Sequence, residues 1–227
     1  MQRIKDAGGT AHSYPVIRIT QADNSSTLNY IINNLSGFDI AIFISPTSVQ
    51  QTLDKIISLP GKLTLAVIGK STEAMLKKYG YTAQIIPDEF NSESLLEHPC
   101  FHHANITNKS IIIFRGVGGR DLLGNELTQR GAQITYAETY RREKNPLPSL
   151  TTEELSNLDA LTVTSNEGLQ NLFDLTDNRT KLIELPIIVP GKRAQQLAEK
   201  LGFNKIIPAT NATDDACLQA LANHFND

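Results

Sequence analysis

The chain has 227 residues, 40% of them hydrophobic, which is enough apolar material for one large domain or two small ones, each with its own core. Its 21 Lys and Arg residues against 24 Asp and Glu give a formal net charge of -3, which argues against a general nucleic-acid surface. Two cysteines outside any motif, and no apolar stretch long enough to span a membrane, predict a reduced, cytoplasmic protein.

The first residues predict the end of a helix. Within residues 1–13, Ile4-Lys5-Asp6 precede Gly8-Gly9, a pattern typical of a last helical turn and its glycine cap. Residues 14–19 then alternate as an extended segment does, and residues 21–26 form a polar break. On pattern alone, residues 14–19 fit an ordinary strand of a sheet.

An internal repeat follows this segment. Residues 38–46, FDIAIFISP, correspond to residues 158–166, LDALTVTSN, and residues 62–70, KLTLAVIGK, correspond to residues 185–192, LPIIVPGK. Each copy predicts strand, polar turn, helix, strand, turn, helix and strand. This alternation predicts an α/β fold with two similar parallel-sheet domains of flavodoxin or Rossmann type. In such sheets ligands bind beyond the carboxyl ends of the strands, so the two domains would face each other across a cleft.

Between the two copies lies a glycine-rich loop. Residues 111–114, IIIF, predict a strand buried on both faces, and the loop of residues 115–120, RGVGGR, ends it. Three glycines in four positions between two arginines predict an anion site. A dinucleotide fingerprint is the competing interpretation, but Asp121 stands where the third glycine belongs and its carboxylate would face the pyrophosphate. A short helix and an extended segment, residues 134–140, follow.

These pieces together resemble the uroporphyrinogen-III synthase family. The likeness rests on the RGxGGR-type loop, the Leu122-Leu123 pair, the Arg-Gly-Ala of residues 130–132, and the Tyr-Arg-Arg of residues 140–142. It implies a cyclising hydro-lyase of tetrapyrrole and haem biosynthesis. Such an enzyme converts hydroxymethylbilane into uroporphyrinogen III, with inversion of the terminal ring and loss of water. It also implies a monomer with no metal and no cofactor, which would receive its substrate by transient contact with hydroxymethylbilane synthase.

The resemblance also implies domain boundaries. Domain one would comprise residues 1–13 and 143–227, and domain two residues 22–133. Residues 14–21 and 134–142 would form a two-stranded antiparallel link between them. The family usually opens with a strand and most of a helix that have no counterpart in this sequence. Either the start codon was assigned too late, or domain one lacks its usual first strand.

Tyr140 is the expected catalytic residue. Its position matches the family's functional tyrosine, and a phenol with a pKa of about 10 is protonated at neutral pH and can hydrogen-bond a departing oxygen. A ring that only packs, with its hydroxyl in water, is the competing interpretation. Tyr136 is the nearest alternative, and strict period-two alternation would put both tyrosines on one face.

The substrate carries eight carboxylates, so its expected contacts are cations, hydroxyl groups and backbone N–H groups. The residues expected to bind it are Ser45, Lys70, Ser71, Thr72, Arg115, Gly116, Gly118, Gly119, Arg120, Ser165, Asn166, Gly191, Lys192 and Arg193. For Ser45, Thr72 and Ser165, helix capping is the competing interpretation.

The group His98, Cys100, His102 and His103 looks like a metal site, but its spacing matches no closed zinc site and instead fits a solvated helix end or loop. For the whole chain, the functional alternative from a different class is a non-catalytic bilobed module that binds a polyanionic small molecule.

Overall fold

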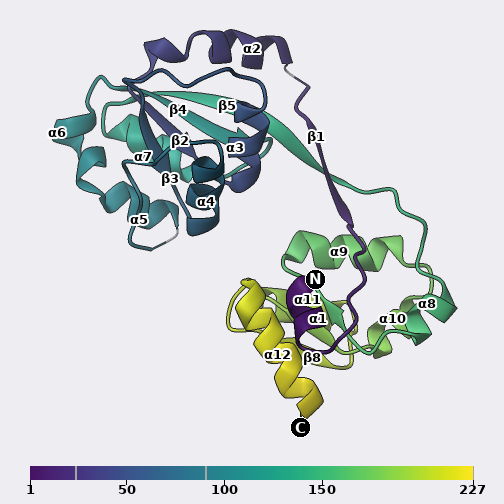
Figure 1. Cartoon of the computed structure of the whole chain (residues 1–227). Helices are drawn as coiled ribbons and strands as arrows, with labels where there is room; N and C mark the ends of the chain where they lie inside the picture. The colour runs from purple at the N-terminus through teal and green to yellow at the C-terminus, as the bar shows by residue number, and fades with distance from the viewer. Residues whose placement is uncertain (24, 90, 227) are drawn as a thin grey trace. The chain divides into compact units, whose positions relative to one another are not determined.

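The computed structural model describes residues 1–23, 25–89 and 91–226, and Figure 1 shows it with helices and strands labelled. The chain divides into two compact units. Unit 1 comprises Met1–Arg18 and Glu143–Asp227, and unit 2 comprises Ile19–Arg142. Strand β1 (Ile17–Gln21) leads along the chain from unit 1 into unit 2, and strand β5 (Gln133–Lys144) leads back.

The remaining elements follow the predicted alternation of strands and helices. Unit 2 contains α2 (Ser25–Asn33), η1 (Leu35–Gly37), β2 (Ile40–Phe43), α3 (Pro46–Leu53), β3 (Thr64–Val67), α4 (Lys70–Lys78), α5 (Ser92–Glu97), η2 (Pro99–Phe101), α6 (His103–Ile106), β4 (Ser110–Gly116) and α7 (Leu122–Gln129). Unit 1 contains α1 (Gln2–Asp6), α8 (Thr152–Ser156), β6 (Leu161–Thr162), α9 (Asn166–Leu175), α10 (Arg179–Glu184), β7 (Ile187–Val189), α11 (Lys192–Lys200), β8 (Ile206–Pro208) and α12 (Asp214–Asn226).

Both sheets are built mainly from parallel strands. In unit 2 the strand order is β1-β5-β4-β2-β3, and the pairs β2–β3, β2–β4 and β4–β5 are parallel. In unit 1 the order is β6-β7-β8, and both pairs are parallel. Parallel neighbours need a crossover connection, which the intervening helices supply. The predicted α/β class with parallel sheets is confirmed.

Alternate residues of β4 face two different cores in unit 2. Ile112 and Phe114 pack on the face covered by α2, α3 and α4, which we call the α3 face. Ile111 and Ile113 pack on the opposite face, which is covered by α5, α6 and α7 and which we call the α7 face. All four side chains are at most 2% exposed. The run of apolar residues is therefore buried on both sides, as predicted.

The internal repeat reappears as a repeated order of elements. Unit 2 runs β2, α3, β3, α4 and then a single parallel bridge from Ala66 to Ile85. Unit 1 runs β6, α9, β7, α11 and β8, with α10 inserted before β7. The N-terminal segment forms the predicted turn, because Gly9 N–H donates to the Ile4 carbonyl at 2.9 Å and Gly8 has φ +85°. Within the described ranges, no helix is long and apolar enough to cross a membrane.

Asp39 joins the starting ends of three strands. Its N–H donates to the Ser110 carbonyl at 2.8 Å, and its carbonyl accepts from Thr64 N–H at 3.0 Å. Its carboxylate accepts from Ser110 N–H at 2.9 Å and from Lys109 Nζ at 3.2 Å. The Ser110 N–H, helped by Lys109, holds the pKa of the Asp39 carboxyl below its usual value. Asp39 therefore links β2 to β3 through its backbone, and to β4 through both its backbone and its ionised carboxylate.

Replacing Asp39 by Asn tests this link. Asn can still accept from Ser110 N–H but has no charge beside Lys109, so we expect the free energy of unfolding to fall by roughly 0.5–1 kcal/mol at neutral pH. Because the pKa is lower in the folded state, this stabilisation exists above the unfolded-state value of about 3.9 and is lost as pH falls through the folded-state value. Urea unfolding of both proteins at about pH 7 and about pH 3 measures the difference. A difference that stays constant would contradict the ionic role.

Candidate active site

Three of the expected site residues, Ser45, Gly116 and Tyr140, lie together where the parallel strands of unit 2 end. Ser45 follows β2, Gly116 is the last residue of β4, and Tyr140 on β5 is paired in register with Gly116. The Tyr140 hydroxyl lies 3.2 Å from the Oγ of Ser45. Since open α/β sheets bind ligands at this edge, these residues form the centre of the candidate site.

Ser45 is fixed by the helix that it begins. Its Oγ accepts from Ser48 N–H at 3.0 Å, and the Ser48 hydroxyl accepts from Ser45 N–H at 3.2 Å, which completes a capping box. Pro46 occupies the first helical position, where its missing N–H removes no helical bond. Capping, the competing interpretation of Ser45, is confirmed. The same oxygen contacts Tyr140, so the start of α3 also positions the phenol.

Tyr140 packs tightly against the backbone of Gly116. Tyr140 is 4% exposed. A Cβ added at Gly116 would lie 2.8 Å from both Cε2 and Cζ of the ring, which is closer than real Cβ contacts come. Position 116 therefore has to be glycine for the ring to lie where it does. The Tyr140 hydroxyl has a defined protein partner, in contrast to the interpretation that leaves it in water.

The loop after β4 contains a left-handed glycine, and hydrogen bonds from the Arg115 side chain hold its backbone. Gly118 has φ +74°, a left-handed conformation that favours glycine. The carbonyls of Gly119 and Arg120 accept from Arg115 Nη1 at 3.2 and 3.3 Å. Gly118 and the Arg120 side chain are exposed. Arg115 thus supports the loop through its carbonyl groups, while Gly118 and the Arg120 side chain remain exposed.

Arg115 has a different role from the one its sequence position suggested. Its guanidinium donates to the Asp121 carboxylate at 2.7 Å and to the Glu138 carboxylate at 3.3 Å, and the residue is 8% exposed. Two carboxylates around one guanidinium leave no net positive charge for a bound anion. Arg115 braces the loop internally, so Arg120 is the exposed cation that remains there.

The two tyrosines of β5 lie on opposite faces of the sheet, so the prediction that they share one is wrong. Tyr136 packs on the α7 face, with the Arg115 guanidinium carbon 3.8 Å above its ring centroid. Tyr140 instead contacts Ser45 at the start of α3. The reason is a register shift: Glu138 pairs with Arg115, but Tyr140 rather than Thr139 pairs with the next residue of β4. A bulge of this kind reverses the alternation after it.

The first turn of α4 holds three further expected site residues, Lys70, Ser71 and Thr72. Gly69 is the N-cap with φ -146°, and no side chain caps this helix. Lys70 and Ser71 are exposed in the first turn, whereas Thr72 is 2% exposed. Thr72 therefore does not cap α4. It is buried inside unit 2, whereas its neighbours Lys70 and Ser71 are exposed to solvent.

In unit 1, Ser165 repeats the geometry of Ser45. Its Oγ accepts from Gly168 N–H at 3.0 Å and caps α9, so the capping interpretation is confirmed here too. The backbone angles are φ -157° and ψ 156° at Ser165 against φ -157° and ψ 157° at Ser45. Asn166, the next residue, is exposed.

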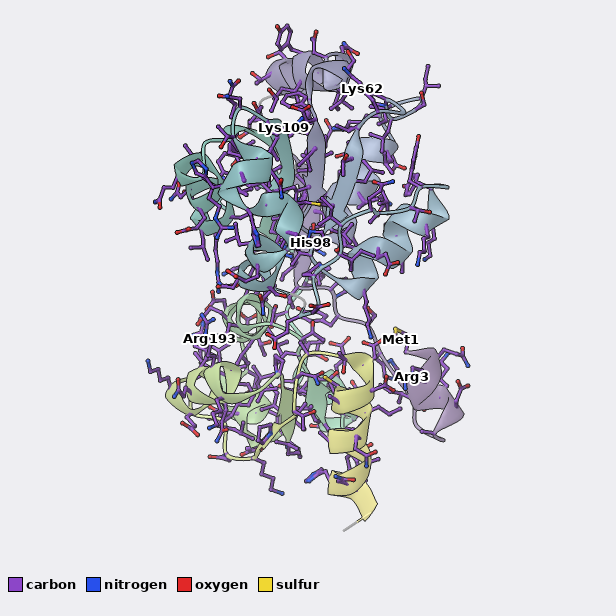
Figure 2. All side chains as sticks on the ribbon, turned by 90° about the vertical axis from the view of Figure 1, so that its left-hand side faces the viewer. Met1, Arg3, Lys62, His98, Lys109 and Arg193 are labelled. Carbon is purple, nitrogen blue, oxygen red and sulfur yellow. The ribbon has the colours of Figure 1, made fainter. Side chains whose placement is uncertain are left out.

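The second expected turn of unit 1 begins α11. Gly191 is its N-cap with φ +86°, again the left-handed region. Lys192 and Arg193 follow with exposed side chains, and Figure 2 labels Arg193. This helix start therefore combines two cations with the N–H groups of a first turn, which suits a carboxylate.

The His and Cys residues at 98–103 lie at the ends of short helices. His98 Nδ1 accepts from Cys100 N–H at 3.3 Å, and His102 Nε2 lies 3.1 Å from the Glu97 carbonyl. Across the part of the chain that the structure describes, no three His, Cys, Asp or Glu residues are arranged to hold a metal ion.

The sequence patterns do not single out the residues that support the site. Asp121 and Glu138 both bind Arg115, yet in the sequence Asp121 stands out only as a departure from a dinucleotide fingerprint. Thr139 and Ser48 belong to no motif. A regular pairing of β4 with β5 is enough to predict that Glu138 lies beside Arg115. The bulge at Thr139 interrupts this pairing and has no signal in the sequence.

The family model and two similar relatives point to the same family. A family model described as uroporphyrinogen-III synthase HemD matches residues 1–219. The uroporphyrinogen-III synthases of Salmonella typhimurium and Escherichia coli K12 are 30% and 29% identical, each over 97% of this chain and 94% of the relative.

Solved structures agree on the fold. The uroporphyrinogen-III synthetase of Helicobacter pylori 26695 is similar with TM-score 0.65 and 14% identity, over 93% of this chain and 92% of that one. A mutant uroporphyrinogen III synthase of the extreme thermophile Thermus thermophilus gives TM-score 0.58 and 16% identity, over 98% and 92% of the two chains.

Replacing Arg115 by Lys tests the brace. Lysine keeps the charge but cannot reach two carboxylates and two carbonyls at once, so we expect the free energy of unfolding to fall by about 1–3 kcal/mol. The matched variant Arg120→Lys changes an exposed cation and should stay within about 0.5 kcal/mol of the parent. Guanidinium unfolding compares the three proteins. Equal stabilities would show that Arg115 does not support the loop.

Replacing Gly116 by Ala tests the contact with Tyr140. The added methyl group has to displace the tyrosine ring or the loop, and overpacking of this kind destabilises by roughly 1–3 kcal/mol. Gly61→Ala is the control, because a Cβ there meets nothing within 4 Å. Thermal unfolding should separate the two variants clearly, and a Gly116→Ala protein as stable as Gly61→Ala would refute the tight fit.

Proposed function

The chain belongs to the uroporphyrinogen-III synthase family of enzymes in tetrapyrrole biosynthesis, and we propose that Tyr140 is the proton donor of its reaction. The substrate, hydroxymethylbilane, loses its terminal hydroxyl as water and closes into uroporphyrinogen III. The observation that carries the proposal is the pair formed by the Tyr140 hydroxyl and the Ser45 Oγ, 3.2 Å apart beside the glycine loop.

In the proposed arrangement, Ser45 is the donor of the Ser45–Tyr140 pair. The Ser45 oxygen accepts from Ser48 N–H, and its own O–H donates to the Tyr140 oxygen. In that arrangement the Tyr140 O–H points away from Ser45 and toward a departing oxygen. Ser45 would then also stabilise the negative charge that develops on the phenol oxygen.

The proposed first step breaks one C–O bond. The bonding electron pair leaves with the hydroxyl oxygen, which takes the proton of Tyr140 and departs as water. The pyrrole nitrogen supplies electrons to the carbon left behind, which gives an azafulvenium cation beside the tyrosinate. Protonation of the leaving group matters because hydroxide is a poor leaving group at neutral pH.

Exposed groups at helix starts would hold the substrate carboxylates. Helices α3, α4, α9 and α11 have at least eight residues each, and their first N–H groups carry partial positive charge. The exposed side chains that fit this role are Lys70, Ser71, Asn166, Lys192 and Arg193 at these helix starts, and Arg120 in the glycine loop. Arg115 and Thr72 are left out because both are buried.

We propose that the glycine loop moves to admit the substrate to Tyr140, which is 4% exposed and packs against Gly116 of this loop. Gly118 in its left-handed conformation and the adjacent Gly119 give the loop backbone freedom for such a shift. The proposal therefore includes loop movement on substrate binding.

The finer architecture is also part of the proposal. We propose two similar domains joined by an antiparallel link of β1 and β5, in a monomer that receives its substrate by transient contact with hydroxymethylbilane synthase. The division of the chain into two units, their shared element order and the β1–β5 neighbourhood in the sheet support the domain organisation.

Replacing Tyr140 by Phe removes the donor and keeps the ring. We expect kcat to fall about 100-fold, the lower end of the range for general acid catalysis, with little change in KM. Freshly prepared hydroxymethylbilane is supplied, and the product isomers are separated by chromatography. Tyr136→Phe is the matched control on the same strand and should keep nearly full activity, since that hydroxyl lies 3.5 Å from a backbone carbonyl on the α7 face.

The same assay addresses the binding-module alternative. A parent protein that binds hydroxymethylbilane but never raises the yield of the inverted isomer would favour a non-catalytic role. A Tyr140→Phe variant with parent-like kcat would instead keep the enzyme and discard Tyr140 as its donor.

A further inference from the structure

We propose that Thr139 is a positioning residue, which holds the β-bulge that directs Tyr140 toward Ser45. The inference rests on the function proposed for Tyr140. Thr139 is 0% exposed, so it would act on the reaction without touching the substrate. Its contribution would be made through the backbone of β4 and β5.

The bulge changes the face on which Tyr140 lies. Up to Glu138, β5 alternates regularly, with Ile134 and Tyr136 on the α7 face and Ala137 on the α3 face. Regular alternation would continue by placing residue 140 beside Tyr136. Instead the pairing steps from Arg115–Glu138 directly to Gly116–Tyr140, and Thr139 is the extra residue.

The hydroxyl of Thr139 fastens this irregular point. It donates to the Arg115 carbonyl at 3.3 Å, where the register shifts. The ladder then resumes, since Val117 N–H donates to the Tyr140 carbonyl at 2.8 Å. A buried hydroxyl needs such a partner, and a buried carbonyl left without one is unfavourable. The hydrogen bond therefore favours the bulged register over a regular one.

The contacts of Tyr140 agree with this account. Thr139 and Tyr140 are both buried, at 0% and 4% exposure, in a sheet that is covered on both faces. Only the bulged register brings the Tyr140 ring onto Gly116 and its hydroxyl to Ser45. Loss of the bulge would misplace the donor without removing it.

Two substitutions separate positioning from simple support. Thr139→Val keeps the shape and removes the hydroxyl, and we expect kcat to fall about tenfold with KM nearly unchanged, as for a displaced catalytic group. Thr139→Ser restores a hydroxyl and should recover most of kcat. Thr176→Val is the matched control, because Thr176 is also buried, at 1% exposure, and donates to the Leu172 carbonyl at 2.8 Å in unit 1. It should lose stability but keep kcat.

A double variant shows whether the effect passes through Tyr140. In the Tyr140→Phe background, Thr139→Val should lower kcat no further, because the donor it positions is already absent. A parent-like kcat for Thr139→Val beside an impaired Tyr140→Phe overturns this inference alone. An additive loss in the double variant overturns it as well. A parent-like kcat for Tyr140→Phe removes the proposed function and this inference together.

Discussion

The alternation of side chains along β5 decides which helix each residue meets, and the site depends on one interruption of that alternation. Tyr136 and Tyr140 are four residues apart and would normally lie on the same face. The shift between Arg115–Glu138 and Gly116–Tyr140 places them on opposite faces, one under the arginine brace and the other against Ser45. The strand thus has one tyrosine that packs against Arg115 and another that lies at the candidate site.

The electrostatics of the glycine loop follow from the same strand. The ring of Tyr136 packs against Arg115, and Asp121 and Glu138 balance the charge of Arg115 within the protein. With the Arg115 charge balanced inside the protein, the backbone N–H groups and exposed Arg120 are the groups of this loop that we propose for anion binding. Backbone donors suit a flexible polycarboxylate, because they are fixed by the fold and require no ordering of long side chains on binding.

Much of the fold followed from local patterns. The buried run of β4, the order of strands and helices, and the serine caps at Ser45 and Ser165 were all predicted, because each depends on residues close in sequence. The partners of Arg115 were not, since an arginine next to glycines looks alike whether it is exposed or paired. The bulge was not either, because Thr139 has no local signature and its effect arises only from pairing with β4. The sequence predicted Tyr140, Ser45 and Gly116 as site residues, and the structure brings these three together, but the prediction that Tyr136 shares the face of Tyr140 was wrong.

The two repeated turns look alike in sequence, each with a glycine before a helix, yet they differ in what they tolerate. Gly69 has φ -146°, which any amino acid can adopt, whereas Gly191 has φ +86°. The backbone at position 69 is therefore one that Ser or Asp can adopt, and both residues cap helices better than glycine does. At position 191 any residue other than glycine would be strained. We therefore expect the glycine to be kept more strictly at position 191 than at position 69.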